Sequence, residues 1–276
     1  MAVNVLNTKD GREKTALSRR YAKDWFAART SGEVIAVGKA TPPQQPGRPD
    51  KPDLLNPRDV PKRKPGTLAG QIALLHAVAH IELNAVDLHW DIILRFCHVD
   101  MPMGFYDDWV QAADDESKHF NLMCDCLEAL DSHYGALPAH AGMWRAADDT
   151  VADFMGRLAV VPMVLEARGL DVTPGMIEVF RKAGGLTHAV EALAVIYSEE
   201  VSRVAYGSKW FNFLCGRENH DPKSMFHALI KQYLQGPLKP PFNEEKRADA
   251  GLPPDFYWPL ATDHRAGQRN NNPSKK

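Results

Sequence analysis

The sequence predicts an all-α protein built around a four-helix bundle. Long stretches place apolar residues at the three- and four-residue spacing of amphipathic helices. No stretch shows the sustained alternation of polar and apolar residues that is typical of a half-buried strand. Glutamates also recur at matching intervals in four helical stretches, as they do in bundles that hold metal ions between their helices.

Composition sets the general class of the protein. The chain has 276 residues, of which 44% are hydrophobic and 25% charged, and this balance is ordinary for a globular protein. A formal net charge of -2 gives no strong signal for nucleic-acid binding. No apolar run reaches the roughly 18 residues of a membrane span and no signal-peptide pattern opens the chain, so we expect a cytoplasmic protein without a membrane partner.

The four cysteines point to an intracellular redox state. They lie within helical patterns and show no Cys-x-x-Cys spacing. Reduced, mostly buried thiols are therefore expected, rather than a disulfide framework or a zinc ribbon.

Residues 1–65 form the first of three predicted regions. Apolar residues such as Trp25 predict a helix over residues 10–30 that packs on the main body. Eight prolines follow between Thr41 and Pro65, and this density excludes a helix and favours an extended strap. If the strap crosses the site described below, we expect it to control access.

Residues 66–217 contain the predicted bundle. Thr67 is a suitable N-cap for a first helix that continues to about Phe96. A second helix is expected from about Tyr106 to Tyr134. The short connection would make the two helices an antiparallel hairpin.

The second half of the bundle begins after a loop predicted over Pro138–Met143. Asp149 or Thr150 is expected to cap a third helix that ends at Gly169. Pro162 lies inside this helix and removes a backbone hydrogen-bond donor. We therefore expect a local distortion close to the glutamate that follows it.

A short helix from Asp171 to about Lys182 and a fourth long helix over Thr187–Leu214 complete the predicted bundle. The third region, residues 218–276, adds an amphipathic helix over Asp221–Gln235. We expect residues 236–276 to be mostly irregular, because they are rich in Pro, Asn and Lys and contain few apolar runs.

Four glutamates form a two-fold pattern along these helices. Glu82 precedes Glu116 by 34 residues, and Glu166 precedes Glu200 by the same interval. His119 follows Glu116 by three positions, which places both side chains on one face of a helix. Matching intervals are expected of two related helical hairpins, so one glutamate per helix would face the middle of the bundle.

An oxygen-rich site with one imidazole suits iron or manganese. The predicted metal ligands are Glu82, Glu116, His119, Glu166 and Glu200. Arg203 stands where the pattern would have a second histidine, and a guanidinium cannot bind a metal but can pair with glutamates. Three outcomes remain open: two metal ions with an altered second position, a single ion, or none.

Other residues are weaker candidates near this site. His76 and His80, four positions apart, either bind a metal, support its ligands through hydrogen bonds, or hydrogen-bond within the core. His89 lies seven positions after the first glutamate on nearly the same face, so it is a reserve ligand. Glu199 directly precedes the fourth predicted glutamate ligand and is easily confused with it, because one position turns a helix by about 100°.

Four blocks of the sequence stand out by their length, order and spacing. They read LLHAVAHIELNAVDLHWD, FYDDWVQAADDESKHFNLM, RLAVVPMVLEARGLDVTPGM and the run EEV-x-R-VAYG-x-KWF. Over about Pro42 to Cys215, the chain resembles a bacterial ferritin-like family called domain of unknown function 455, which is similar in fold to diiron tRNA-modifying hydroxylases. The resemblance implies a ferritin-like bundle and the five ligands named above, but no particular reaction. Arg203 departs from the family pattern, which has a histidine there.

The leading functional hypothesis is an oxidoreductase in which one or two iron or manganese ions activate dioxygen on an organic substrate. A small molecule or a modified nucleoside is the expected substrate class, and the chain is compatible with a homodimer. Two alternatives come from other classes: a metal-binding or storage protein without turnover, and a bundle whose site has degenerated at Arg203 and which acts through partners.

Overall fold

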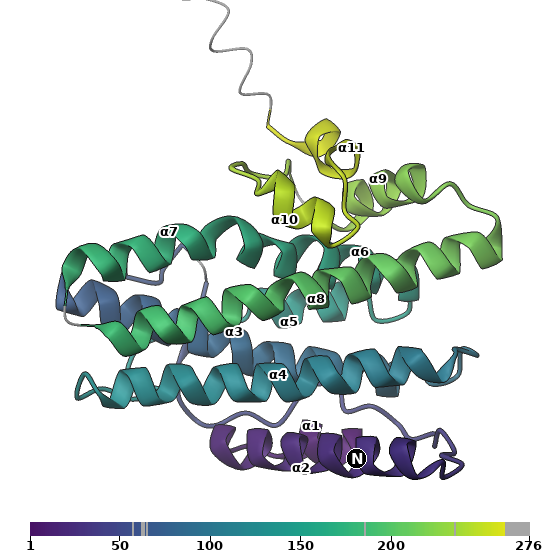
Figure 1. Cartoon of the computed structure of the whole chain (residues 1–276), viewed down its shortest axis with the longest axis horizontal. Helices are drawn as coiled ribbons and strands as arrows, with labels where there is room; N and C mark the ends of the chain where they lie inside the picture. The colour runs from purple at the N-terminus through teal and green to yellow at the C-terminus, as the bar shows by residue number, and fades with distance from the viewer. Residues whose placement is uncertain (57, 62–63, 65, 185, 235, 263–276) are drawn as a thin grey trace, which may run out of the picture.

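The computed structural model describes residues 1–262, except 57, 62–63, 65, 185 and 235. These residues are predominantly helical, which confirms the all-α prediction. Four long helical segments run alongside one another (Figure 1). They are α3 (Leu68–Arg95), α4 (Met103–Glu128), the continuous segment α6 (Phe154–Val160), η1 (Val161–Glu166) and α7 (Ala167–Ala183), and α8 (Thr187–Glu218).

Helices α3 and α4 form the predicted hairpin. Thr67 caps α3 as expected, because its side chain accepts a hydrogen bond of 3.1 Å from the backbone N–H of Gly70. Helix α4 begins directly after Pro102 and ends at Glu128, so both ends lie before the predicted ones. The chain turns soon afterwards, at Asp131, whose positive φ of 53° belongs to the left-handed region and is incompatible with a continuing helix.

The start of the second hairpin differs from the prediction. Much of the expected loop and cap region is a helix, α5 (Gly142–Asp149), so Asp149 and Thr150 end a helix instead of beginning one. Asp153 is the true cap of α6, since its side chain accepts a hydrogen bond of 2.7 Å from the backbone N–H of Gly156.

The segment from α6 to α7 is continuous. Pro162 lies in a turn of π-helix, η1, which confirms the predicted distortion before Glu166. The expected helix end at Gly169 and the separate short helix expected from Asp171 are wrong, because α7 passes through both positions. The Asp171 carboxylate instead accepts hydrogen bonds from Arg247 at 2.7 and 2.8 Å, a contact made by the C-terminal region.

The C-terminal region is more ordered than its composition suggested. After α8 comes α9 (Pro222–Tyr233), which begins one residue after the predicted start and is capped by Asp221, while its expected last residue, Gln235, lies outside the described residues. Short helices interrupt the stretch that we expected to be irregular; they are α10 (Glu244–Asp249), α11 (Pro254–Tyr257) and the 3₁₀ turn η2 (Trp258–Leu260). Tertiary packing stabilises them, since Phe256 and Tyr257 are buried.

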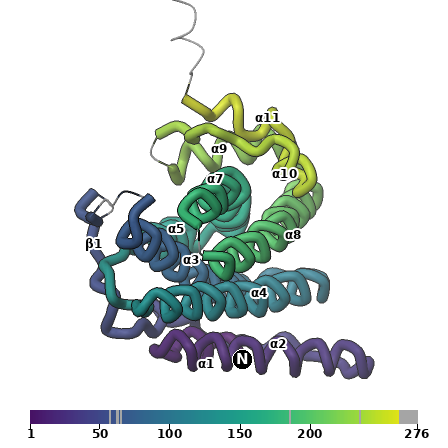
Figure 2. The backbone as a smooth tube through the Cα atoms, turned by 60° about the vertical axis from the view of Figure 1, so that its left-hand side comes forward, coloured from purple at the N-terminus to yellow at the C-terminus, as the bar shows by residue number. Residues whose placement is uncertain are grey.

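The N-terminal helices lie on the outside of the main body, where α2 (Gly11–Ser31) packs against α4 and α1 (Ala2–Asn7) packs against α3 (Figure 1). The described residues of the Pro-rich strap are mostly irregular, and the carbonyl of Pro43 accepts a hydrogen bond from Arg95 of α3. Strap residues Leu54–Leu55 form strand β1, which pairs in parallel with β2 (Ala139–His140); Figure 2 shows β1 at the edge of the molecule. These two-residue strands do not alter the fold class.

Three further expectations can be compared with the described part of the chain. No helix there is both long and apolar enough to cross a membrane. All four cysteines are free thiols, in agreement with the predicted reduced state. Three of them are buried and Cys97 is partly exposed. The cavity that reaches the glutamates is lined by no described residue of the strap, so the structure gives no support to a gating role for this segment.

Candidate metal centre

The four glutamates that recur in the sequence meet inside the protein. Glu82 lies on α3, Glu116 on α4, Glu166 at the end of η1 and Glu200 on α8, and each is at most 7% exposed. A cavity of about 120 Å³ is lined by all four side chains. Buried carboxylates are costly unless cations or hydrogen-bond donors compensate them, so their convergence marks a candidate binding site.

This polar centre interrupts the apolar core. On α4, buried apolar residues up to Ala113 belong to one cluster and those from Phe120 onward belong to another, with Glu116 between them. On α8, the change falls between Ile196 and Val204, on either side of the glutamate. Two apolar regions therefore pack the helices together on both sides of the carboxylates.

Two glycines allow the helices around the centre to approach closely. A Cβ at Gly207 of α8 would lie 2.5 Å from the ring of Pro162, and a Cβ at Gly169 of α7 would lie 3.0 Å from Cδ of Glu200. Gly169 is thus a helical residue without a side chain, which leaves room for a carboxylate. This explains why a glycine that resembled a helix end in the sequence lies inside a helix.

His119 contacts two of the glutamates with the same ring nitrogen. Its Nδ1 lies 3.2 Å from Oε2 of Glu82 and 3.3 Å from Oε2 of Glu116. Within the described residues, these three side chains form a group whose potential ligand atoms all lie within 4.8 Å of one another. Adjacent ligands on one ion with bonds of about 2.1 Å are about 3.0 Å apart, so both distances from Nδ1 are close to those between ligands of a single metal ion.

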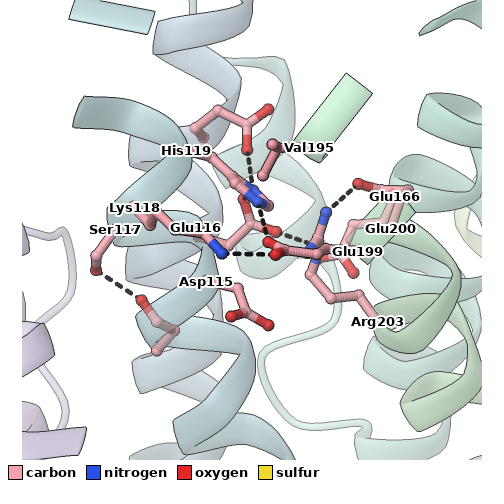
Figure 3. Close-up of polar contacts among 12 residues, drawn as sticks. Asp115, Glu116, Ser117, Lys118, His119, Glu166, Val195, Glu199, Glu200 and Arg203 are labelled. Atoms are coloured by element: carbon pink, nitrogen blue, oxygen red, sulfur yellow. Dashed lines mark hydrogen bonds and ion pairs between the residues drawn. The ribbon is translucent and has the colours of Figure 1, made fainter. Parts of the chain in front are cut away.

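The other ring nitrogen of His119 is held by Glu199. Nε2 lies 2.7 Å from Oε2 of Glu199, whose Oε1 accepts a hydrogen bond of 2.6 Å from Lys118 (Figure 3). Nε2–H is therefore the donor to Glu199, which aims Nδ1 at the carboxylates of Glu82 and Glu116. Metal-binding histidines commonly show this arrangement, because a carboxylate fixes the orientation of the imidazole.

Glu199 was the residue most easily confused with Glu200. The structure brings both to the centre, and they do different things there: Glu199 reaches His119 on α4, whereas Glu200 contacts Arg203 on its own helix. One position turns a helix by about 100°, which separates the two directions. No feature of the sequence indicates the contact of Glu199 with His119, because this contact depends on the distance between α4 and α8.

Electrostatics distinguish the two carboxylates beside His119. Burial raises the pKa of Glu82 well above its usual range, and the neighbouring Glu116 carboxylate raises it further. Burial acts on Glu116 too, but the Arg203 charge and the hydrogen bonds with Glu82 and His119 together outweigh it and hold the pKa of Glu116 well below its usual range. The pair titrates together, with Glu82 as the member that takes up a proton.

The imidazole of His119 responds to its three carboxylate partners. Burial alone would lower its pKa, yet hydrogen bonds to Glu116, Glu199 and Glu82 raise this pKa well above the usual value. Hydrogen bonding from His119 in turn is the main cause that lowers the pKa of Glu199 to about 2. A metal ion at Nδ1 would have to displace the proton held there, so its binding competes with protonation.

Arg203 fills the other half of the centre. The side chain is fully buried; Nη2 donates a hydrogen bond of 2.5 Å to Oε2 of Glu200, and Nε lies 2.5 Å from Oε1 of Glu116 in an ionic contact (Figure 3). Burial opposes the charge, but Glu116 and Glu200 outweigh it and raise the pKa of Arg203. A guanidinium therefore joins carboxylates of two helices where a second histidine was expected.

Glu166 and His89 have no such partners. Both carboxylate oxygens of Glu166 and Nε2 of His89 are buried without a hydrogen bond, and Nε2 lies 3.5 Å from Oε1 of Glu166. Burial raises the pKa of Glu166 well above its usual range, with a further contribution from Glu200 and Glu116. The reserve ligand predicted from the sequence thus lies in the centre.

The other two histidines of α3 serve a different contact. The ring of His80 accepts a hydrogen bond at Nδ1 from the hydroxyl of Tyr134 and donates one from Nε2 to the carbonyl of His140. His76 stacks on the same tyrosine and accepts a hydrogen bond from the backbone of Gly135. These contacts connect both residues to the segment that follows α4, in agreement with the alternative that they hydrogen-bond within the core.

Four helical segments that enclose buried carboxylates and two histidines define a helical protein with a candidate metal centre. The chain belongs to the family described as "Protein of unknown function (DUF455)", whose model matches residues 7–258. It is also similar to an uncharacterized protein of Haemophilus influenzae, with 38% identity over 209 residues that cover 74% of this chain and 72% of the relative. A comparison with solved structures found no match.

Proposed function

We propose that this protein is a ferritin-like metal protein that binds one iron or manganese ion and uses it as an oxidoreductase with dioxygen. One observation carries the proposal: Nδ1 of His119 lies 3.2 and 3.3 Å from two buried carboxylates, while Glu199 holds the opposite nitrogen. Glu82, Glu116 and His119 would bind the ion. Mixed carboxylate and imidazole ligands suit iron and manganese.

The ferritin-like assignment rests on how the ligands are distributed. Each of the four glutamates comes from a different helical segment, and a Glu-x-x-His pair on α4 points to the middle. Ferritin-like carboxylate proteins assemble their centres in this way. The departure from their pattern is the arginine on α8.

Charge favours one ion over two. Arg203 neutralises part of the negative charge at Glu116 and Glu200, and it takes the side of Glu116 that a second ion would use. Glu82 and Glu166 have no permanent cation of their own, and the pKa of each is raised by burial. A single divalent ion would stabilise the charged carboxylates of Glu82 and Glu166. A second ion would lie closer to the Arg203 guanidinium and would be repelled by its charge.

The cavity indicates where a substrate would lie. Besides the glutamates, its lining is mostly apolar, with contributions from Ile81, Leu165, Val172 and Ile196. Its volume of about 120 Å³ equals that of about four water molecules, whereas pockets for drug-sized ligands measure roughly 300 to 1,000 Å³. We therefore propose a small organic substrate and no longer favour a modified nucleoside.

A bound redox-active ion would supply dioxygen activation. In a hydroxylation, dioxygen accepts four electrons, two from the substrate C–H bond and two from an external reductant, and its second oxygen atom leaves as water. The chain's own residues would orient the reactants: Glu199 fixes His119, and the apolar lining excludes bulk water from the carboxylates.

A second candidate is a centre that binds no metal. The contacts of Arg203 with Glu116 and Glu200 favour it, because they compensate two of the four glutamates without any ion. The helices would then be joined by ion pairs, and the protein would act through partners.

Metal analysis separates the two candidates. Protein purified without chelators is expected to bind one equivalent of Fe²⁺ or Mn²⁺, measured by anaerobic calorimetric titration and elemental analysis. Glu82→Gln should lose this binding, whereas Glu178→Gln, a matched control at an exposed glutamate of α7, should retain it. Reductant-dependent oxygen uptake by the iron form, absent from Glu82→Gln, supports the oxidoreductase.

Each part of the proposal can fail separately. No metal binding by the unmodified protein overturns the metal centre and supports the Arg203-compensated bundle. Metal binding without reductant-dependent oxygen uptake overturns the oxidoreductase while leaving a metal-binding protein.

A further inference from the structure

We propose that His89 is a second nitrogen ligand of this metal ion and provides the imidazole that α8 lacks because Arg203 stands in its place. This inference rests on the proposed function, since it concerns the same ion. It differs from the expected ferritin-like pattern, in which both histidines follow a glutamate by three positions. Here the second histidine comes from α3, seven positions after Glu82.

The burial of His89 supports this role. The residue is 1% exposed, and its Nε2 makes no hydrogen bond. A buried polar nitrogen without a partner is uncommon and calls for an explanation such as an ion. Its ring packs against Trp109 with 5.3 Å between centroids, and this contact holds the imidazole in its present direction.

Two carboxylates face the free nitrogen of His89. Nε2 lies 3.5 Å from Oε1 of Glu166 and 3.8 Å from Oε1 of Glu116. Two ligands of one ion are separated by about 3.0 Å when adjacent and about 4.2 Å when opposite, for bonds of about 2.1 Å. Both distances fall within this range.

Glu116 connects the two histidines. Its Oε2 faces Nδ1 of His119, and its Oε1 faces Nε2 of His89. An ion that contacts both oxygens of this carboxylate would therefore be approached by one imidazole from α4 and another from α3. Arg203 also contacts Oε1 of Glu116, so the guanidinium and the ion would share this carboxylate. Because a guanidinium cannot bind a metal, the second nitrogen ligand would come from His89.

The Glu166 side chain can move towards a bound ion. Neither of its oxygens makes a hydrogen bond, so a change of its rotamer breaks none. It ends the π-helical turn η1 and borders the cavity, which gives its side chain space to move. The unpartnered atoms of Glu166 and His89 are thus explained together as donors to one cation.

The nitrogen ligands can be counted directly. We would load the full-length protein with one equivalent of Mn²⁺ and record electron spin echo modulation, using protein with natural histidine and with ¹⁵N-histidine. The unmodified protein is expected to show two coordinated histidine nitrogens. His89→Gln should show one and bind Mn²⁺ at least about tenfold more weakly, whereas His220→Gln at an exposed position should match the unmodified protein.

The count on unmodified protein decides the question even if His89→Gln does not fold. One coordinated histidine nitrogen in Mn²⁺-loaded protein overturns the role of His89 and leaves the proposed function intact. No Mn²⁺ or Fe²⁺ binding by unmodified protein overturns both. Two histidine nitrogens, of which one disappears in His89→Gln, establish the inference.

Discussion

Arg203 and Glu116 lie in ionic contact at the middle of the protein, with Nε of the guanidinium 2.5 Å from Oε1 of the carboxylate. Both side chains are buried, so the attraction is screened far less than at a surface. The contact leaves Oε2 of Glu116 to His119 and holds the pKa of Glu116 well below its usual range. The Glu116 carboxylate thus contacts His119 with one oxygen and Arg203 with the other.

Replacing Arg203 with histidine should change the number of metal ions that the protein binds. We expect Arg203→His to bind a second equivalent of Fe²⁺ or Mn²⁺, because it restores an imidazole and removes a competing positive charge. The measurement is calorimetric titration with elemental analysis. A single equivalent in this variant would contradict the view that the guanidinium occupies the second cation position.

Replacing Arg203 with an uncharged residue tests how much its positive charge contributes to stability. In metal-free protein, Arg203→Met should lower the free energy of unfolding by about 3 to 5 kcal/mol, because it leaves buried carboxylates without their cation. Urea unfolding monitored by circular dichroism provides the measurement. Arg181→Met removes an exposed ion pair on α7 and should cost less than about 1 kcal/mol.

Glu199 should control metal affinity without being a ligand. Glu199→Ala removes the acceptor for Nε2 of His119, so the imidazole loses its fixed orientation, and we expect Mn²⁺ affinity to fall by about 10- to 100-fold. Lys118→Ala is the matched control, since it removes the other partner of Glu199 and leaves the contact with His119. Equal losses in the two variants would argue against the orienting role.

Burial of His80 should make folding depend on pH. Burial lowers the pKa of His80 to about 4, whereas the unfolded chain takes up this proton near 6.5. Between these values the unfolded state binds more protons, so stability falls as the pH drops from about 6.5 to about 4. The full effect is about 3 kcal/mol.

Urea unfolding at a series of pH values measures this dependence in metal-free protein. His80→Gln should show a shallower decline between pH 6.5 and 4, whereas His220→Gln, at an exposed position, should follow the unmodified protein. An unchanged slope in His80→Gln would assign the decline to other groups.

The contact of Gly207 with Pro162 should be sensitive to one methyl group. Gly207→Ala would place Cβ 2.5 Å from the proline ring and push α8 away from η1, with an expected loss of about 1 to 3 kcal/mol. Gly216→Ala lies on the same helix with no atom within 4 Å of the new Cβ, so it should be neutral or stabilise by about 0.5 kcal/mol. Similar unfolding midpoints for the two variants would show that α8 can shift without cost.

The long helices were predictable because their signals are local. Thr67 caps its helix as expected, and Pro162 distorts its helix as a missing backbone donor requires. Gly169 and Asp171 misled the prediction because their roles are set by distant residues. Gly169 makes space for Glu200, and Asp171 binds Arg247 of α10.

The sequence by itself determined the helical class, the two hairpins and the set of charged residues in the centre, because helical periodicity and the repeated interval of 34 residues can be counted along the chain. Only the tertiary structure decided what those residues contact. It directed Glu199 to His119, joined Arg203 to Glu116, and left His89 facing Glu166. Helical spacing fixes the face on which a side chain lies, but the packing of one helix on another fixes its distance from a partner.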